Sequence, residues 1–408
     1  MRIYPNLRHV RLIDAAVRLG SLTQAADHVG ISQPAGSQAL VRLEDLFGGR
    51  LLERTATRAV ATPRGEVVAR RAARALAFLK AAASKIARLE KARPAKPVLL
   101  EAQAAMPQLR AISAFAETGS FSAAARRLGL SEPSVNRAAR DLEQIVGEAL
   151  FAGTSRHLML TPAGRLLSRH ANLVMKELDS AFEEVRELAG AFDGRVVVGT
   201  LPLVRTAIVP AAVVALADRR PDATVEVLDG PYDTLVQDLE NGRIDMLVGA
   251  LRPDLPRRDL VEETLFQDDL SIVARADHPL ARRRSVTPAD LAGFPWVLPR
   301  PGTPTRASFD RLAATFPPDA SLAGVIETGS LVALRSILMM SDRLTILSRR
   351  QILYEEEAGY LTVLQYRLSD TTRPIGLTLR SGWQPTALQA DFLAELRRVV
   401  AEEHEGAE

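Results

Sequence analysis

One stretch of this chain occurs twice. Residues 11–65 recur as residues 110–164 with a constant shift of 99 positions and no gap, and about a third of the aligned residues are identical. A repeat with a fixed period indicates one supersecondary unit that the chain builds twice. The motifs kept in both copies are Gly20-Ser21 and Gly119-Ser120, Ser32-x-Pro34 and Ser131-x-Pro133, Leu43-Glu44 and Leu142-Glu143, and Thr62-Pro63-x-Gly65 and Thr161-Pro162-x-Gly164.

The charge is unevenly distributed along the chain, although the formal net charge is only +3. Residues 1–100 contain 18 lysines and arginines against 7 acidic residues, residues 101–190 contain 10 against 11, and residues 191–408 contain 24 against 31. A basic N-terminal region followed by an acidic C-terminal region indicates a module that binds a polyanion, joined to a domain with a different function. A chain of 408 residues has room for about two to four domains.

Several classes of protein are disfavoured by what the sequence lacks. Cysteine is absent, which excludes disulfides, thiolate metal sites and thiol redox chemistry. The histidines form no metal-binding spacing, no motif of a hydrolase or nucleotide-binding loop occurs, and the adjacent pair Asp268-Asp269 would point to opposite faces of a strand. We therefore expect no enzyme activity, no metal and no cofactor. With no apolar leader and no bilayer-spanning segment, we expect a cytoplasmic protein without a membrane partner.

Apolar spacing and turn residues predict the structure of the repeated unit. Two short helices joined by a tight turn, the second with a polar face, are typical of a helix-turn-helix. The alternative is a helical hairpin that serves only packing, and the basic charge of residues 1–100 favours DNA binding over it. In the first copy the predicted elements are helices over Val10–Leu19 and Gln24–Val29, a helix from the Ser32 N-cap to Gly48, and a two-stranded wing over Leu51–Thr62.

The first copy closely resembles the winged helix-turn-helix of LysR-type transcriptional regulators over the segment GSLTQAADHVGISQPAGSQALVRLEDLFGGRLLERTATRAVATPRG. The resemblance implies that the helix beginning at Ser-Gln-Pro-Ala enters the major groove of DNA and that wing arginines approach the backbone. The residues implied as DNA contacts are Gln33, Pro34, Ala35, Ser37, Gln38 and Arg42 on the helix, and Arg54 and Arg58 on the wing. Gly36 departs from the family pattern, and we expect it to loosen the helix by about 1 kcal/mol.

The second copy keeps the packing residues but changes the implied contact residues. Glu132 replaces Gln33, and a carboxylate is repelled by phosphates although it accepts a hydrogen bond from cytosine. Gly153 replaces Arg54 and removes a cation from the wing. We expect the first copy to be the main DNA reader, with contact by the second copy left open through Ser131, Arg137 and Arg140.

Each copy is followed by a helix whose apolar residues alternate in steps of three and four, the pattern of a coiled-coil seam. In the LysR family this linker helix makes the dimer, so the resemblance implies a homodimer or homotetramer assembled through the second run. The first seam comprises Ala72, Leu76, Leu79, Ala83 and Ile86, and the second comprises Leu167, Ala171, Val174, Leu178, Ala181, Val185 and Leu188. The segment Arg93-Pro94-Ala95-Lys96-Pro97 predicts a hinge between the two halves.

Beyond Gly194 strands alternate with helices, which predicts a parallel sheet covered by helices on both faces. This half resembles the family's effector domain, a two-lobed α/β fold similar to type 2 periplasmic binding proteins. The expected domains are therefore two all-α winged helix-turn-helix units at 1–65 and 104–164, linker helices at 66–93 and 165–190, a hinge at 94–103, and an effector domain at 193–400 with lobe I at 193–250 and 365–400 and lobe II at 251–364. The predicted strands are Arg195–Thr200, Thr224–Leu228, Asp245–Val248, Leu270–Ala274, Val325–Glu327, Leu344–Leu347, Leu361–Leu364 and Ile375–Leu379.

Ligands of open α/β sheets bind at the carboxyl ends of strands and at helix N-termini. The candidate effector residues in such loops are Thr200, Leu201, Pro202, Tyr232, Thr303, Arg306, Thr328 and Ser330. The alternative is that these hydroxyls only cap helices and that Arg306 belongs to a structural ion pair. The loop from Arg300 to Arg306 resembles loops of LysR regulators for sugar uptake and for protocatechuate-type catabolism, and a free Arg306 would favour a carboxylate. The resemblance therefore implies a sugar or an aromatic or carboxylic acid as the effector.

Together these features favour a DNA-binding transcriptional regulator controlled by a small molecule between the lobes. Its partners would be double-stranded DNA, the effector and further copies of the chain, and the resemblance allows RNA polymerase as another. The alternative is a cytosolic small-molecule-binding protein whose helical front half serves only oligomerisation.

Overall fold

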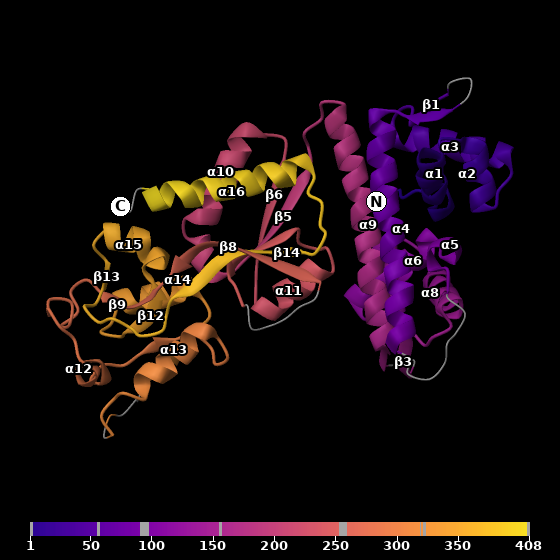
Figure 1. Ribbon diagram of the computed structural model, residues 1–408. Helices are drawn as coiled ribbons and strands as arrows, with labels where there is room; N and C mark the ends of the chain where they lie inside the picture. The colour runs from indigo at the N-terminus through magenta and orange to yellow at the C-terminus, as the bar shows by residue number, and fades with distance from the viewer. Residues whose placement is uncertain are drawn as a thin grey trace. The chain divides into compact units, whose positions relative to one another are not determined.

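The computed structural model describes residues 3–54, 58–89, 98–154, 157–252, 259–318, 320 and 324–405. The chain divides into two compact units, the first formed by Met1–Gly194 with Glu240–Arg243 and the second by Arg195–Leu239 with Ile244–Glu408 (Figure 1). The first unit contains both copies of the repeat, and the second contains the α/β half.

Both copies fold as winged helix-turn-helix units, as the sequence predicts. Ser32 and Ser131 accept hydrogen bonds from the amides of Ala35 and Ser134, which begins the third helix of each copy at its predicted cap. The first copy comprises α1 (Leu7–Leu19), α2 (Leu22–Val29), α3 (Gln33–Phe47), β1 (Leu52–Arg54) and β2 (Ala59–Ala61), and the second comprises α6 (Met106–Thr118), α7 (Phe121–Leu128), α8 (Glu132–Val146), β3 (Phe151–Thr154) and β4 (His157–Leu160).

The repeated glutamate anchors each wing to its third helix. Glu44 Oε1 accepts a hydrogen bond from the Leu51 amide at 2.9 Å, and Glu143 Oε1 accepts one from the Leu150 amide at 2.8 Å. Burial alone would raise the pKa of Glu143, but hydrogen bonds from Arg140 and the Leu150 and Phe151 amides outweigh it and hold this pKa below its ordinary value. The Leu-Glu motif is therefore kept because it positions the wing.

The Thr-Pro-x-Gly motif joins each wing to the long helix that follows. The hydroxyls of Thr62 and Thr161 accept the amides of Gly65 and Gly164, in both cases at 3.0 Å. A Cβ at Gly65 would lie 1.9 Å from the carbonyl oxygen of Leu51, and one at Gly164 would lie 2.1 Å from the equivalent wing carbonyl. Only glycine lets the wing pass this close to the helix.

Gly36 has a packing role that the sequence does not predict. A Cβ at this position would lie 3.0 Å from the Cβ of Ala26, so α3 approaches α2 more closely than a side chain there would allow. Glycine at this position therefore allows α2 and α3 to pack closely, in addition to the expected loosening of α3.

The two linker helices, α4 (Pro63–Leu89) and α9 (Pro162–Leu188), pack against each other within the chain. The predicted seam residues belong to one hydrophobic cluster, apart from Leu188, which is 55% exposed. Arg71 and Arg74, in the N-terminal half of α4, contact Glu184 and Glu177, in the C-terminal half of α9. The two helices are therefore antiparallel (Figure 1). Within the described residues this seam is covered by the first linker helix of the same chain, and the expectation that residues 165–190 join two chains stays a prediction.

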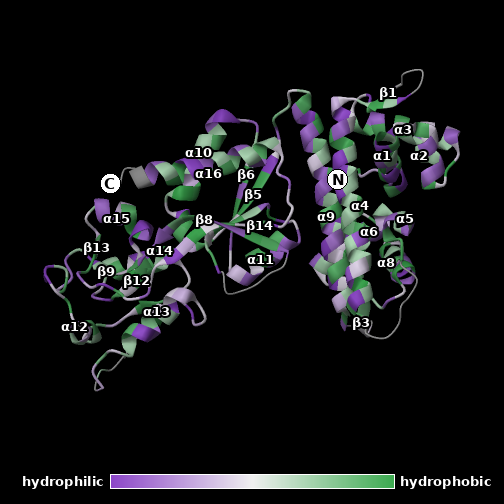
Figure 2. Ribbon diagram, in the orientation of Figure 1, coloured by the Kyte–Doolittle hydropathy of each residue, from purple (hydrophilic) through white to green (hydrophobic). Residues whose placement is uncertain are grey.

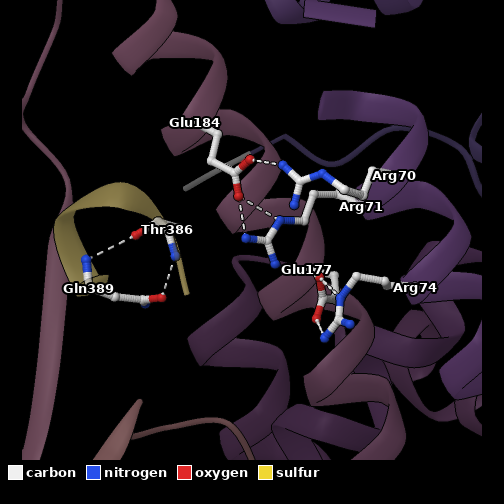
Figure 3. Close-up of polar contacts among 7 residues, drawn as sticks. All are labelled: Arg70, Arg71, Arg74, Glu177, Glu184, Thr386 and Gln389. Carbon is white, nitrogen blue, oxygen red and sulfur yellow. Dashed lines mark hydrogen bonds and ion pairs between the residues drawn. The ribbon is translucent and has the colours of Figure 1, made fainter. Parts of the chain in front are cut away.

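An arginine–glutamate network, formed by Arg70, Arg71, Arg74, Glu177 and Glu184, connects α4 to α9 (Figure 3). Arg71 is only 1% exposed; its Nη1 donates to Glu177 at 2.9 Å and its Nε donates to Glu184 at 2.7 Å. Burial alone would lower the pKa of Arg71, but the two carboxylates outweigh burial and raise it, so the guanidinium stays charged. Arg74 donates to both oxygens of Glu177.

The predicted hinge lies partly outside the described residues, which resume at Val98. Its final part forms a short helix, α5 (Leu100–Gln103), whose buried Leu100 packs on α4. The predicted hinge over 94–103 therefore ends in a helical turn, and its role as a hinge stays a prediction.

In the part of the chain that the structure describes, the second unit contains three sheets, one in lobe I and two in lobe II. The first has the strand order β6-β5-β7-β14-β8, in which β5, β6 and β7 are parallel and β14 is antiparallel to both of its neighbours. The prediction of a parallel sheet is thus corrected to a mixed one. Its strands are β5 (Arg195–Thr200), β6 (Thr224–Asp229), β7 (Met246–Ala250), β8 (Leu260–Asp268) and β14 (Arg373–Arg380), and its helices are η1 (Pro202–Arg205), α10 (Ile208–Arg219), α11 (Tyr232–Glu240) and α16 (Ala387–Glu405).

Helices cover both faces of this sheet, as predicted. Val196 and Val198 pack with α10 and α16, whereas Val197 faces α11. Figure 2 shows the inner strands as largely hydrophobic, the pattern of strands buried on both faces.

The other two sheets lie in lobe II. Strand β9 lies between β12 and β13, antiparallel to both, and β10 pairs in parallel with β11. Because β8 pairs with β14 of the first sheet, lobe I includes residues 260–268, and the predicted boundary of lobe II at 251 is corrected to the end of β8. The elements are β9 (Leu270–Arg275), α12 (Pro288–Ala292), β10 (Val297–Leu298), α13 (Pro304–Ala313), β11 (Ile326–Glu327), α14 (Leu331–Met339), β12 (Thr345–Ser348), η2 (Arg349–Ile352), α15 (Leu353–Glu357) and β13 (Leu361–Val363).

Glu143 makes the stability of the second copy depend on pH. A carboxylate with a depressed folded-state pKa stabilises the fold above its unfolded pKa of about 4.3, and this stabilisation is lost as the pH falls through the folded value. We expect Glu143→Gln to lower the free energy of unfolding at pH 7, with the difference from the unsubstituted chain shrinking between about pH 5 and pH 3. Urea unfolding across this pH range measures it, with the exposed Glu132→Gln as the control, and a pH-independent difference would contradict the assignment.

Removing the buried arginine should destabilise the first unit strongly. Arg71→Ala leaves Glu177 and Glu184 without their buried partner, a change that typically costs about 3–5 kcal/mol. Arg70 is 44% exposed, and Arg70→Ala should cost about 1 kcal/mol or less. Denaturant unfolding followed by helical circular dichroism tests this, and similar losses for the two variants would mean that the buried pairs carry no special weight.

Candidate nucleic-acid interface and effector site

The outward face of α3 carries most of the residues predicted to contact DNA. Gln33, Pro34, Ala35, Gln38 and Arg42 are exposed, and Ser37 is half-buried. Within the described residues, the side chains of Gln33, Gln38 and Arg42 form no hydrogen bond or ion pair. Their donors and acceptors therefore remain available to a ligand that lies along this face.

The positive charge of Arg42 is reinforced by residues of α1. Arg42 and Arg8 both lower the pKa of His9, after burial, which is the largest cause. The equivalent of Arg42 in the second copy is Asp141, so this concentration of positive charge belongs to the first copy.

The wing residues extend the same interface. Arg54 is the last residue of β1, and its side chain lies outside the described part of the structure. Arg58 is exposed directly before β2. Antiparallel pairing of β1 with β2 holds the wing beside α3, through the Glu44 contact described above.

The equivalent face of α8 is partly used by internal contacts. Ser131 caps the helix and Arg137 is exposed, but Arg140 donates to Glu143 at 2.7 Å and its guanidinium lies 5.1 Å from the centre of the Phe151 ring. Glu132 is exposed at the first turn. Arg137 is thus exposed, whereas Arg140, with a side chain that is 43% exposed, is paired with Glu143.

Other cations of the second copy are also engaged. Arg127 forms an ion pair with Glu117 at 2.7 Å, and Arg126 donates to Ser122. The two copies therefore share a backbone design but differ in electrostatics, as the charge count predicts.

The effector residues predicted in lobe I gather where β5 and β6 end. Thr200 is fully buried and donates to the carbonyl of Leu228 at 3.0 Å, and the Leu201 amide donates to Val248. Pro202 is exposed at the start of η1. Tyr232 is 8% exposed at the start of α11, with the Arg252 guanidinium 3.7 Å from its ring centre.

The residues predicted in lobe II gather at the carboxyl ends of β10 and β11. Thr303 caps α13 and Ser330 caps α14, so both hydroxyls satisfy backbone amides. The Thr328 hydroxyl accepts the Ser330 amide at 3.1 Å. Two helix N-termini thus open on one corner of the lobe, beside the parallel strand pair.

Arg306 is an ion-pair residue in this structure. It donates to Glu327 at 2.5 Å and to Asp310 at 3.0 Å, and hydrogen bonding to Glu327 and then to Asp310 raises its pKa. The contacts of Arg306 are therefore those of a structural ion pair, the alternative that the sequence analysis left open.

Two connections between the lobes were missed at the sequence level. Arg335 of α14 donates to Thr206, which follows η1, at 3.0 Å. Asp268 accepts from Ser348 at 2.6 Å and from Arg373, and burial is the main cause that raises its pKa. No local pattern marks these residues, because each pair joins segments more than 70 positions apart.

The described ranges contain neither a metal-binding cluster nor a membrane-spanning helix. No three His, Asp or Glu side chains gather there closely enough to hold a metal ion. Of the helices seen in those ranges, none has the length and apolar character needed to cross a membrane.

Comparison with known proteins matches the two units to two family models. The model of the LysR substrate binding domain matches residues 189–401, and that of the bacterial regulatory helix-turn-helix protein, lysR family, matches residues 7–66 and again 106–165. The HTH-type transcriptional regulator GalR of Pseudomonas putida is 33% identical over 403 residues, which cover 98% of each chain. The HTH-type transcriptional regulator PcaQ of Agrobacterium fabrum is 28% identical over 69% of this chain and 91% of its own. These relatives are regulators and not enzymes.

Solved structures agree with this fold. A full-length OxyR variant from Pseudomonas aeruginosa matches with a TM-score of 0.53 at 20% identity, covering 72% of this chain and 94% of its own. CbnR, described as a LysR family transcriptional regulator, matches with a TM-score of 0.50 at 22% identity, covering 72% and 99%.

Proposed function

The chain belongs to the LysR family of bacterial transcriptional regulators, and from that premise we propose that the first copy of its repeat is the main DNA reader, controlled by a small molecule bound between the lobes. The observation that carries this proposal is the face of α3, where the side chains of Gln33, Gln38 and Arg42 are exposed and make no hydrogen bond or ion pair with the described residues. Such groups pair well with base edges in the major groove.

Arg42 supports this assignment through its charge. Together with Arg8 it places positive charge beside the recognition helix, where DNA phosphates would lie. The wing residues Arg54 and Arg58 would approach the backbone, while Pro34, Ala35 and Ser37 would line the contact. In the second copy Ser131, Arg137 and Arg140 are candidates for a weaker grip, since Arg140 is already paired with Glu143.

For the effector we propose a small organic acid, with a sugar as the second candidate. The N-termini of α13 and α14 supply partial positive charge near Thr303, Thr328 and Ser330, which favours an anionic group. Across the lobes, the Arg335–Thr206 contact brings α14 to the segment that follows Thr200, Leu201 and Pro202. Arg306 would reach an acid only by exchanging Glu327 or Asp310 for it, and Tyr232 would offer its ring edge.

A regulator of this kind works where bacterial DNA is, so we place the chain in the cytoplasm, with RNA polymerase as a further candidate partner. The competing hypothesis of a small-molecule-binding protein with a merely structural front half is disfavoured, because both family models and the named relatives are those of DNA-binding regulators.

Substitutions on α3 should weaken DNA binding more than a substitution on α8. Gln38→Ala and Arg42→Ala should each cost about 1–3 kcal/mol in binding free energy, because each removes a group aimed at DNA. Arg140→Ala should have a smaller effect, since Arg140 is engaged by Glu143. Fluorescence anisotropy on DNA from the regulator's own upstream region, at constant salt, measures this. Equal losses for α3 and α8 would contradict a dominant first copy.

The effector can be sought by thermal shift. A ligand at about 100 times its Kd stabilises the folded chain by about 2.7 kcal/mol, so a screen of aromatic acids, aliphatic acids and sugars should show one class raising Tm. Ser330→Ala should reduce that rise, whereas Ser341→Ala, beyond the far end of α14, should not. A rise confined to sugars would overturn the choice of an acid.

A further inference from the structure

We propose that a single chain is a complete two-site DNA reader, in which α3 and α8 occupy successive major grooves of an operator whose two half-sites differ in sequence. This inference rests on the proposed function, that α3 binds DNA. It goes further by giving the second copy a reading role and by assigning both readers to one chain.

The antiparallel linker pair places the two copies at opposite ends of a spacer. Each copy packs its first helix on its own linker helix, α1 on α4 and α6 on α9. Each linker helix has 27 residues and is therefore about 40 Å long. The wings join the starts of these helices, so they are separated by about that length, close to the roughly 34–36 Å of one turn of DNA.

The arginine–glutamate network favours pairing of α4 with α9 over pairing of two α4 helices. The shift of 99 positions makes Lys85 the counterpart of Glu184 and Phe78 the counterpart of Glu177. In a pair of α4 helices from two chains, the buried Arg71 would face lysine and phenylalanine and would lack a carboxylate. A buried charge without a partner is strongly unfavourable.

In a pair of α9 helices from two chains, Glu177 would lack its arginine partners. The counterparts of Arg71 and Arg74 in α9 are His170 and Leu173. Glu177, which accepts from both arginines in the structure, would face only that histidine and leucine. The counterpart of Arg70 is Arg169, which would still give Glu184 a cation. It is therefore the pairing of Arg71 and Arg74 with Glu177 that requires one linker helix of each type.

Further contacts attach the first copy to the second linker helix in the same chain. Phe47, at the end of α3, stacks on Phe182 of α9 with ring centres 4.4 Å apart. The Tyr4 hydroxyl donates to Asp179 at 3.0 Å. The orientation of α3 is thus set by the helix that carries the second copy.

The two recognition helices present different chemistry at equivalent positions. Gln33, Ser37, Gln38 and Arg42 of α3 correspond to Glu132, Asn136, Arg137 and Asp141 of α8. Arginine pairs with guanine, glutamine with adenine, and a carboxylate accepts from the amino group of cytosine. A dimer of identical readers selects a palindrome, whereas these two helices select unlike half-sites.

Crosslinking the full chain tests whether pairing is internal. The chain contains no cysteine, so Phe78→Cys with His170→Cys, whose rings lie 6.4 Å apart, introduces the only reactive pair. Treatment with a short bis-maleimide at low protein concentration should give an internally bridged single chain on a denaturing gel. A second pair, Phe47→Cys with Phe182→Cys, whose rings lie 4.4 Å apart, leaves the arginine–glutamate network intact and guards against misfolding of the first. A two-chain product, or no bridge in either pair, would overturn the proposal.

Selection of random double-stranded DNA by the unsubstituted full chain tests the reading mode. We expect a motif with two unlike halves whose centres lie about 10 base pairs apart. A palindrome, or a single half-site, would overturn this inference and leave the proposed function intact. Failure to enrich any sequence would instead count against DNA reading by α3, and with it against both.

A matched pair of substitutions shows which recognition helix reads which half-site of the operator. Glu132→Gln should change the selected bases in one half only, and Gln33→Glu should change them in the other half only. Changes in both halves from either substitution would mean that the two helices do not read separate half-sites.

Discussion

A guanidinium buried between two carboxylates governs the first half of this protein. Arg71 is almost fully enclosed between α4 and α9, where Glu177 and Glu184 balance its charge. Burial of an ion pair is a weak source of stability, but breaking one is costly, so such a cluster acts mainly by excluding other arrangements. Three features depend on the pairing of α4 with α9. They are the antiparallel linker pair, the placement of the two winged units at its ends, and the packing of Phe47 of α3 on Phe182.

Much of the first unit could be predicted from the sequence because its determinants are local. The caps Ser32 and Ser131 and the Thr-Pro-x-Gly motifs specify elements within a few residues of themselves. The partner of each linker helix could not be predicted in this way. A seam of apolar residues at heptad spacing shows that a helix will be covered, but Leu178 carries no information on whether its neighbour belongs to the same chain.

The second unit shows the same limit. Val196, Val197 and Val198 predicted a strand buried on both faces, and the structure confirms it. Strand β8 was missed, because Glu262 and Glu263 make its sequence look like a loop, and its assignment depends on pairing with β14 more than 100 positions away. Among the candidate effector residues, the sequence located the strand ends and caps correctly, but the Arg335–Thr206 and Asp268–Ser348 contacts between lobes exist only in three dimensions.

On the proposal that both copies read DNA, pairing of α4 with α9 inside one chain would change how the regulator responds to its own abundance. Two readers on separate chains must first meet, so the paired form rises with the square of a low protein concentration. Two readers on one chain are held at a high effective concentration by the segment that connects them, and the paired form rises in direct proportion to the number of chains. A cell with only a few copies of this protein would therefore keep nearly all of them ready for paired binding.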